Sequence, residues 1–337
     1  MPRLWPRWAA LAAAFCVTAV SPAAAQGGDV EFYRGKTVTY IVATAPGGGY
    51  DTYGRLLVRY LEKYLPGSRF VVRNVPGAGQ IIGANTIYVA RPDGLIIGTF
   101  NTGLLYAQML GQEGVRFDLS KMSWIGKLAE EGRSLVVASN SGYGSIQDLM
   151  MSKEPVRLSA AGIGSASYIE TRIMAEALRL NVRLITGFDG NETQLSMLRG
   201  EIAGVLGAAS SNSDFVERGD GKFVLSIAGA RSVIPGVPQA KDFVADPNEL
   251  RLLGLVETMA ELGRLTAGPP NIPPGRLAAL RRAFLAAARD PRLLAEAERL
   301  AIPIEAGPGE EVETKIRLIL DQPPDLIELL RRASQGT

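Results

Sequence analysis

The stretch of the sequence best suited to holding a ligand is Gly47-Gly48-Gly49, which a carboxylate follows at Asp51. Glycine has no Cβ atom, so a ligand can approach the main chain closely there. A helix that begins at this point would offer unpaired N–H groups to a small anion. A nucleotide is disfavoured, because the spacing is not that of G-x-G-x-x-G and no P-loop Lys-Ser/Thr pair follows. The stretch therefore predicts either an anion-binding loop or only a strand-to-helix turn that Asp51 caps.

The residue types that the sequence lacks exclude most catalytic chemistry. It contains no histidine, and its one cysteine, Cys16, lies close to the amino terminus. A Ser-His-Asp or Cys-His nucleophile cannot be built, and neither can an ordinary zinc site with His or Cys ligands. Acid–base catalysis would depend on Asp, Glu, Lys or Tyr, and Asp51 is the only obvious candidate. We therefore expect a protein without catalytic activity that uses no cofactor and no metal. An exported enzyme that uses Asp51 is the lesser alternative.

Residues 1–25 have the features of a secretory signal peptide. Two arginines precede an apolar stretch at 8–20, and alanines at 23 and 25 provide the small residues of a cleavage site. We expect cleavage between Ala25 and Gln26 and export to the periplasm. Removing this segment takes away two of the 36 Lys and Arg residues and none of the 34 Asp and Glu, so no formal net charge remains. A chain without net charge has no long-range field to collect nucleic acid or an anionic membrane.

Apolar, β-rich segments alternate with helical patterns in two runs, at about 36–125 and 135–230. Short apolar strands bounded by glycine are typical of sheets that helices cover on both faces. The alternation favours parallel strands joined by right-handed crossovers, and from Pro273 onward the periodicity is that of helices. Glycine clusters follow strands in both runs, and open parallel sheets bind ligands at the carboxyl ends of their strands. We therefore expect two such edges to face each other across a cleft.

Six segments distributed over the chain resemble the substrate-binding proteins of tripartite tricarboxylate transporters, the Bug or TctC-like family. They are APGGGYDTYGRLL, VVRNVPGAGQIIGAN, RPDGLIIGTFN, SAAGIGSASY, TGFDGNETQLSMLRGEI and RSVIPGVPQAKDF. The resemblance implies an α/β, two-lobed periplasmic-binding-protein (Venus flytrap) fold, each lobe a mostly parallel sheet flanked by helices. It implies lobe one at 26–125 plus about 230–300 and lobe two at 126–229. Carboxyl-terminal helices at 301–337 would pack across the lobes.

The resemblance also implies a function. Family members capture a small carboxylated metabolite between the lobes and deliver it to integral membrane transporter subunits. A sensor that presents the bound carboxylate to a sensor kinase is an alternative. The expected partners are the small carboxylate ligand and the membrane subunits, without nucleic acid, and the receptor is expected to be a monomer. The identity of the ligand stays open, because Tyr168 and Phe188 stand where many family members have histidine and tyrosine.

The loops that form the cleft in this family can be placed on the sequence residue by residue. On lobe one they supply Gly48, Gly49, Tyr50 and Asp51, then Gly77, Ala78 and Gly79, then Thr99 and Asn101. On lobe two they supply Gly164, Ser165, Ala166 and Ser167, then Phe188, Asp189 and Gly190, then Ala208 and Ser210. Main-chain N–H groups and hydroxyls at helix starts can hold a carboxylate without a dedicated arginine, and we expect these loops to do so.

Overall fold

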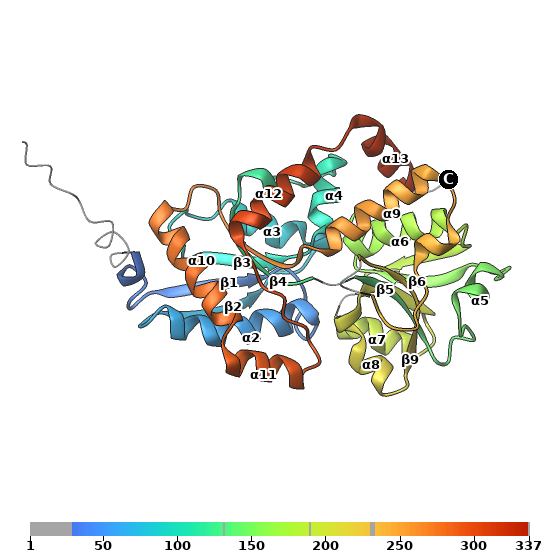
Figure 1. Ribbon diagram of the computed structural model, residues 1–337, viewed down its shortest axis with the longest axis horizontal. Coiled ribbons are helices and arrows are strands. Elements are labelled where there is room, and N and C mark those ends of the chain that lie inside the picture. Colours follow the sequence, from blue (N-terminus) through green and yellow to red (C-terminus); the bar gives the residue numbers. More distant parts are fainter. Residues whose placement is uncertain (1–28, 131, 189, 230–232, 336–337) are drawn as a thin grey trace, which may run out of the picture.

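The structure is a computed structural model that describes residues 29–130, 132–188, 190–229 and 233–335. The expected signal peptide and Asp189 lie outside the described residues. Figure 1 shows two lobes side by side along the long axis, each with its own sheet and helices. We call the lobe with the six-stranded sheet lobe one and the lobe with the five-stranded sheet lobe two. The two-lobed α/β fold expected from the sequence is confirmed.

The sheet of lobe one has the strand order β11-β4-β10-β3-β1-β2. Strand β1 (Thr37–Val42) lies between β2 (Arg69–Asn74) and β3 (Ile96–Phe100) and is parallel to both. Strands β10 (Gly263–Gly268), β4 (Ser123–Ala129) and β11 (Gly307–Pro308) continue the sheet in antiparallel pairs. The carboxyl ends of β1, β2 and β3 therefore share one edge.

The sheet of lobe two has the order β7-β6-β8-β5-β9. Strand β6 (Val156–Ala160) is parallel to β7 (Val182–Thr186) and β8 (Gly204–Ala208), whereas β5 (Arg133–Ala138) is antiparallel to β8 and β9 (Gly221–Ile227). Each sheet is thus mixed, which corrects the expectation of mostly parallel sheets. Strand β10 runs opposite to β1, β2 and β3, and β5 runs opposite to β6, β7 and β8. These are the strands that the chain forms after it has passed from one lobe to the other.

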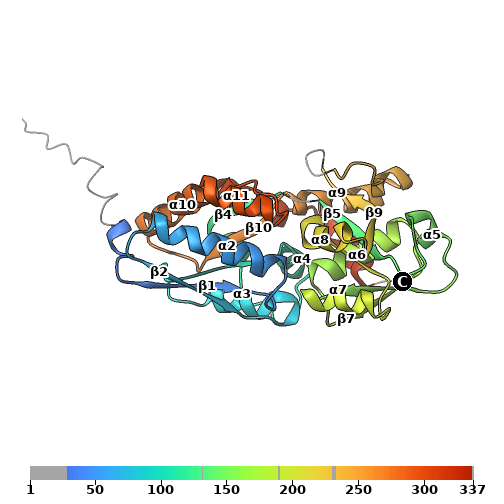
Figure 2. The same cartoon turned by 90° about the horizontal axis from the view of Figure 1, so that it is seen from below.

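The helices of lobe one cover both faces of its sheet (Figure 2). Helix α2 (Gly49–Tyr64) packs against β2 and against α10 (Pro274–Ala288), and α3 (Ile81–Tyr88) packs on β3. Helices α11 (Pro291–Arg299) and α12 (Gly309–Leu320) pack against α2 and β4, and α4 (Gly103–Met109) follows β3. Tyr53, Leu57 and Leu61 show why α2 forms, because their spacing of four residues puts all three in the core.

Lobe two contains α5 (Ile146–Met150), α6 (Ala166–Ala177), α7 (Asn191–Leu198), α8 (Ser213–Glu217), α9 (Pro247–Ala260) and α13 (Pro324–Gln335). Short 3₁₀ helices complete the described elements: η1 (Ala78–Gln80), η2 (Leu119–Lys121), η3 (Ala209–Ser211) and η5 (Ala240–Phe243). Residues 247–260 were expected in lobe one, but α9 packs on α6, β5 and β9 of lobe two. The reason is the apolar face of α9, where Leu253, Val256 and Met259 are buried in the core.

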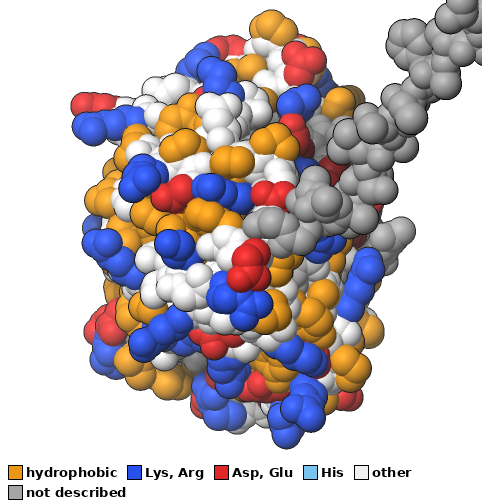
Figure 3. Space-filling model, turned by 90° about the vertical axis from the view of Figure 1, so that its left-hand side faces the viewer, with side chains coloured by type: hydrophobic (Ala, Val, Ile, Leu, Met, Phe, Trp, Pro, Cys, Tyr) orange, Lys and Arg blue, Asp and Glu red, His pale blue; other side chains and the backbone are white. Residues whose placement is uncertain are grey.

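The surface carries charges of both signs. On the end face of lobe one, basic and acidic side chains are interspersed with hydrophobic ones (Figure 3). Within the residues that the structure describes, no helix combines the length and the apolar composition that a membrane span requires.

Candidate functional site

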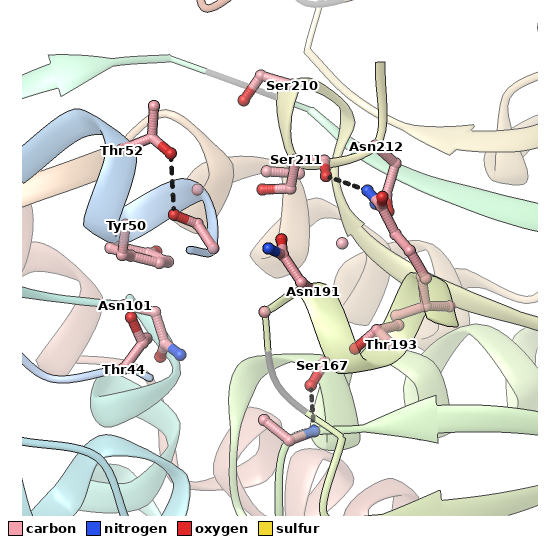
Figure 4. Close-up of a pocket in the computed structure, with 18 of the residues that line it drawn as sticks. Thr44, Tyr50, Thr52, Asn101, Ser167, Asn191, Thr193, Ser210, Ser211 and Asn212 are labelled. Atoms are coloured by element: carbon pink, nitrogen blue, oxygen red, sulfur yellow. Dashed lines mark hydrogen bonds between the residues drawn. The ribbon is translucent and has the colours of Figure 1, made fainter. Parts of the chain in front are cut away.

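A cavity of about 500 Å³ lies between the two lobes. Figure 4 shows Thr44, Tyr50 and Asn101 on the lobe-one side of this cavity and Ser167 and Asn191 on the lobe-two side. Most of the side chains labelled there carry neutral hydroxyl or amide groups. Clefts of this size, with a few polar groups that converge on them, are typical of small-molecule binding.

Three helices begin at the cavity. Helix α2 follows Gly48, α6 follows Ser165 and α7 follows Gly190, and first-turn residues of all three helices line the cavity. The N–H groups of a first turn have no partner within their own helix, and the helix dipole places partial positive charge there. The Ser165 hydroxyl accepts a hydrogen bond from the N–H of Tyr168, whereas Gly48 and Gly190 supply no side-chain cap. The cavity is therefore suited to an anion.

Glycines let the loops of the two lobes approach each other. A Cβ atom at Gly48 would lie 3.0 Å from the Cα atom of Gly190 in the other lobe. A Cβ atom at Gly103 would lie 2.3 Å from the main-chain nitrogen of Ala166, which is closer than real Cβ atoms come to any atom. Glycine is thus needed at these places for the contact between the lobes, in addition to any contact with a ligand.

Asp51 lies beside the cavity wall and is not one of the residues that line the cavity. Its Oδ2 atom accepts hydrogen bonds from Gly47 N–H and Arg55 Nε, each at 2.9 Å, and its Oδ1 accepts one from the Asn74 amide at 2.9 Å. Burial alone would raise the pKa of Asp51, but these hydrogen bonds outweigh it and the pKa is lowered. A carboxylate kept ionised by three donors anchors the glycine turn and is poorly suited to act as a base.

Arg264, in β10, is the most prominent charged group in the cavity wall, and the sequence reasoning did not identify it. Its side chain is buried, and its guanidinium donates to the hydroxyls of Ser210 at 3.2 Å and Ser211 at 3.1 Å across the cleft. The guanidinium also stacks on the rings of Tyr50 and Tyr53, 4.4 and 4.6 Å from their centroids. Its φ angle of 57° lies in the left-handed region, which costs a bulky residue about 1–2 kcal/mol. The surrounding contacts therefore hold Arg264 in place against local strain.

Arg133 and Glu170 form a buried ion pair that also lines the cavity. Arg133 Nε donates to Glu170 Oε2 at 2.7 Å, and Arg133 Nη2 donates to Thr102 Oγ1 at 3.0 Å. The exposed fractions of the two charged side chains are only 7% and 1%. Burial raises the pKa of the Glu170 carboxyl, and the charge of Arg133 opposes that rise. The pair thus places one positive and one negative group in the same wall.

Ten of the residues expected in the cleft line the cavity: Gly48, Gly49, Tyr50, Asn101, Ala166, Ser167, Phe188, Gly190, Ala208 and Ser210. Seven do not: Asp51, Gly77, Ala78, Gly79, Thr99, Gly164 and Ser165. Two of them, Gly79 and Ser165, lie where the lobes approach each other, since a Cβ atom at Gly79 would lie 3.2 Å from the main-chain nitrogen of Ser165. Asp189 is outside the described residues.

Five charged residues of the wall were not identified from the sequence: Arg133, Glu170, Asp214, Arg264 and Arg299. One of them, Glu170, left a signal that could have been read. Glu170 lies four residues after Ala166 and three before Ile173, on the apolar face of α6. A carboxylate on a face that otherwise enters the core is a candidate for a buried, paired group. Arg133 and Arg264 stand at or near the starts of short strands, and nothing local in the sequence indicates that the two would meet at one cavity.

The family model TctC, described as the tripartite tricarboxylate transporter family receptor, matches residues 55–295. The match includes the starts of α6 and α7 and most of both lobes, and it begins after the start of α2. The chain belongs to this receptor family. The family and BugD, a periplasmic binding protein described below, are solute-binding proteins and not enzymes, so the alternative of an exported enzyme is set aside.

Curated relatives of the receptor are distant. A UPF0065 protein from the TAR-I ttuE-ttuC' intergenic region of Agrobacterium vitis is 27% identical over 157 residues, 45% of each chain. A UPF0065 protein of Bordetella pertussis is 23% identical over 277 residues, 79% of each chain. The receptor therefore matches less than half the length of the first of these relatives.

Solved structures resemble the receptor over most of its length. The periplasmic binding protein BugD superimposes with a TM-score of 0.75 at 20% identity, covering 89% of this chain and 98% of BugD. MatC from Rhodopseudomonas palustris, with bound malate, gives 0.72 at 20% identity, with 87% and 99% covered. Another R. palustris protein, with adipate, gives 0.71 at 14% identity, with 88% and 97% covered. At these identities the likeness establishes the fold.

Proposed function

We propose that this receptor is exported to the periplasm, captures a small carboxylate in the cavity between its lobes, and delivers it to integral membrane subunits of a tripartite tricarboxylate-type transporter. One observation carries the proposal. The starts of α2, α6 and α7 and the guanidinium of Arg264 all reach one cavity between the lobes. Export rests on residues 1–25, and the mass of the secreted protein, expected to begin at Gln26, checks it.

The chemistry of the cavity fits a carboxylate. Main-chain N–H groups at a helix start donate to anions, and the helix dipole adds favourable charge. Arg264 adds a permanent positive charge with a planar geometry that matches a carboxylate. Tyr50, Ser210 and Ser211 hold that guanidinium at the cavity wall, so little side-chain entropy is lost on binding.

The bound molecules in two similar structures agree with this ligand class. MatC contains malate and the second R. palustris protein contains adipate, and both molecules are small dicarboxylates. A cavity of about 500 Å³ is large enough for molecules of this size. The similarity of fold favours carboxylates for this receptor, while the residues of the wall decide which carboxylate.

A thermal-shift screen of carboxylates with four to six carbons tests the proposal. A ligand present at 100 times its Kd adds about 2.7 kcal/mol to the free energy of unfolding, which raises the melting temperature measurably. In titration calorimetry, Arg264→Gln is expected to weaken the binding of any hit roughly 10- to 100-fold, as for a lost charged hydrogen bond. Arg91→Gln is the matched control, because the Arg91 side chain is 88% exposed. No stabilisation by any acid at millimolar concentration would contradict the proposed ligand class.

Delivery to membrane subunits needs a separate test. Uptake of the identified acid is measured in cells that carry the receptor together with the membrane subunits, and in cells that lack the receptor. Uptake that depends on the receptor supports transport. Uptake that is the same without the receptor contradicts delivery and leaves carboxylate binding intact.

A further inference from the structure

Two amide side chains of lobe one present their nitrogen atoms to the cavity. Gln80 precedes α3 and Asn101 follows β3, both residues line the cavity, and they are only 6% and 8% exposed. Gln80 Oε1 accepts a hydrogen bond from the N–H of Asn101 at 2.8 Å, and Asn101 Oδ1 accepts one from the N–H of Gly103 at 2.7 Å. Because both amide oxygens are engaged by N–H groups, the orientation of each amide is fixed.

The nitrogen atoms of these two amides are available to a ligand. Among the described residues, Gln80 Nε2 and Asn101 Nδ2 have no hydrogen-bond acceptor. They are also not among the fully enclosed side-chain atoms that lack a partner, so a molecule in the cavity can reach them. Figure 4 shows Asn101 in the lobe-one wall, beside Thr44. Amide nitrogens in such a buried position call for an acceptor, because buried polar groups are almost always hydrogen-bonded.

The backbone of Gln80 also indicates that its side chain has a function. Its φ angle of 80° lies in the left-handed region, which is strained for a residue with a long side chain and which glycine occupies freely. Glycine at this position would relieve the strain but would supply no amide group. Strained backbone of this kind is concentrated at functional sites.

The amide pair and Arg264 reach the cavity from opposite faces of the lobe-one sheet. Arg264 stacks on the ring of Tyr53 in α2, whose buried side chains pack in one hydrophobic cluster. Gln80 stands at the start of α3, whose buried side chains pack in another cluster. Tyr40 of β1 belongs to the first cluster and its neighbour Ile41 to the second, so the clusters lie on opposite faces. A ligand that reaches both places needs a polar group at each end.

We propose that Gln80 and Asn101 form a second, uncharged subsite that donates hydrogen bonds to an acceptor oxygen of the ligand. An NH2 group can only donate, so the oxygen of a carbonyl or of a second carboxylate meets the requirement. The receptor then selects oxo acids and dicarboxylic acids over the monocarboxylic acid of the same chain length. This inference rests on the proposed function, because it names the substrate class of that same cavity. A site with buried donors discriminates against an analogue that lacks the acceptor.

Matched acids test the inference with the mature receptor. Titration calorimetry compares 4-oxopentanoate with pentanoate, succinate with butyrate, and adipate with hexanoate, so that the members of each pair have the same chain length. In at least one pair we expect the acid with the second acceptor to bind more tightly, by roughly 3- to 10-fold for a carbonyl and roughly 10- to 100-fold for a carboxylate. The oxo acid and the dicarboxylic acids show which acceptor is preferred.

Gln80→Glu is the sharpest variant. It keeps an oxygen that accepts the N–H of Asn101, and it replaces the NH2 group that faces the cavity with an oxygen that cannot donate. Asn101→Asp makes the same change at the second amide. In both variants the ratio of affinities within each pair should fall to about one, as the lost donor predicts. Gln147→Glu adds the same charge at an exposed position of α5, outside the cavity, and should leave the ratio unchanged.

Gln80→Gly removes the amide without adding a charge. It also relieves the left-handed strain, so the variant is expected to fold, and its ratio of affinities should fall as in Gln80→Glu. Because the ratio is measured within one variant, a change in stability or in the general affinity for acids does not imitate the result.

The outcomes separate the two proposals. Equal binding of the paired acids by the wild type overturns the inference and leaves the carboxylate receptor standing. A preference that survives in Gln80→Gly or in Asn101→Asp also overturns it, because another group then binds the second acceptor. Failure of every acid to bind contradicts the proposed function itself, and the inference with it.

Discussion

Two regions that line the same cavity differ in the groups they contain: one consists of main-chain turns and the other of charged side chains. The glycine turns, at Gly47 to Gly49 and at Gly190, present main-chain N–H groups, and a Cβ atom at Gly48 or Gly49 would lie 3.0 Å or less from a neighbouring atom. The buried ion pair of Arg133 and Glu170 presents two charged side chains that are almost fully enclosed. Main-chain N–H groups at helix starts bind many anions, whereas a buried charged pair imposes a particular pattern of donors and acceptors. The turns therefore offer donors to the cavity, whereas the two charges of the pair oppose each other within its wall.

The two regions also differ in what a substitution would do. A side chain added to a glycine turn acts between the lobes and should change ligand binding more than folding. Removal of one member of the ion pair acts within the core and should change folding first.

Arg133→Met is expected to destabilise the protein by about 3–5 kcal/mol, because it leaves Glu170 buried without its partner. Urea unfolding followed by circular dichroism measures the loss. Arg218→Met, which removes an exposed pair with Asp214, should leave the urea midpoint nearly unchanged. Adding Glu170→Met to Arg133→Met should restore most of the stability, since the unpaired charge is then gone. A midpoint for Arg133→Met equal to that of the wild type would show that the pair is not buried in solution.

Gly103→Ala is expected to weaken binding of the ligand roughly 10- to 100-fold while the fold is retained. The new Cβ atom would lie 2.3 Å from the main-chain nitrogen of Ala166 and 2.6 Å from Asn101 Oδ1, and overpacking of this kind costs about 1–3 kcal/mol. Part of that cost is relieved if the lobes move apart, so small-angle scattering should show a larger radius of gyration.

The matched control for Gly103→Ala is Gly254→Ala. Gly254 lies in α9, and a Cβ atom there would meet no atom within 4 Å, so the control should bind the ligand as the wild type does. Wild-type affinity in Gly103→Ala would mean that the observed contact between the lobes is not needed for binding.

The glycine turns could be predicted from the sequence because they depend on local signals. Gly48 and Gly49 end an apolar strand and precede a helical pattern, and Ser165 is followed by a helix that it caps. These features are fixed by a few neighbouring residues, so the cleft and its helix starts follow once two α/β runs are identified. The error in strand direction has a different origin, because no local signature marks the passages between the lobes that precede β5 and β10.

The charged groups of the wall could not be predicted in the same way. Arg133 and Glu170 are 37 residues apart, and Arg264 is 54 residues from Ser210. Their meeting depends on β5 and β10, two of the strands where the chain crosses between lobes, and β10 was not recognised as a strand. Only the position of Glu170 on an apolar helix face could have indicated a buried charged pair in advance. The sequence reasoning relied on main-chain N–H groups and hydroxyls to hold a carboxylate, and it did not foresee that Arg133 and Arg264 also line the cavity.

The smallest expected effect tests whether Asp51 only anchors the glycine turn. Asp51→Asn should destabilise the protein by about 1–2 kcal/mol at pH 7, because one hydrogen bond to a charged group is weakened or lost. The pKa of Asp51 is lowered in the folded state, so its contribution is present above the unfolded value near 4 and is lost as the pH falls through the lower folded value. Urea midpoints of wild type and variant should therefore differ at neutral pH and converge as the solution is acidified below about pH 4. Every other carboxylate is shared by the two proteins, so the convergence reports on Asp51 alone. If the variant instead kept its full stability but lost ligand binding, Asp51 would be a ligand contact, and the division between anchoring and binding groups in the turn would have to be redrawn.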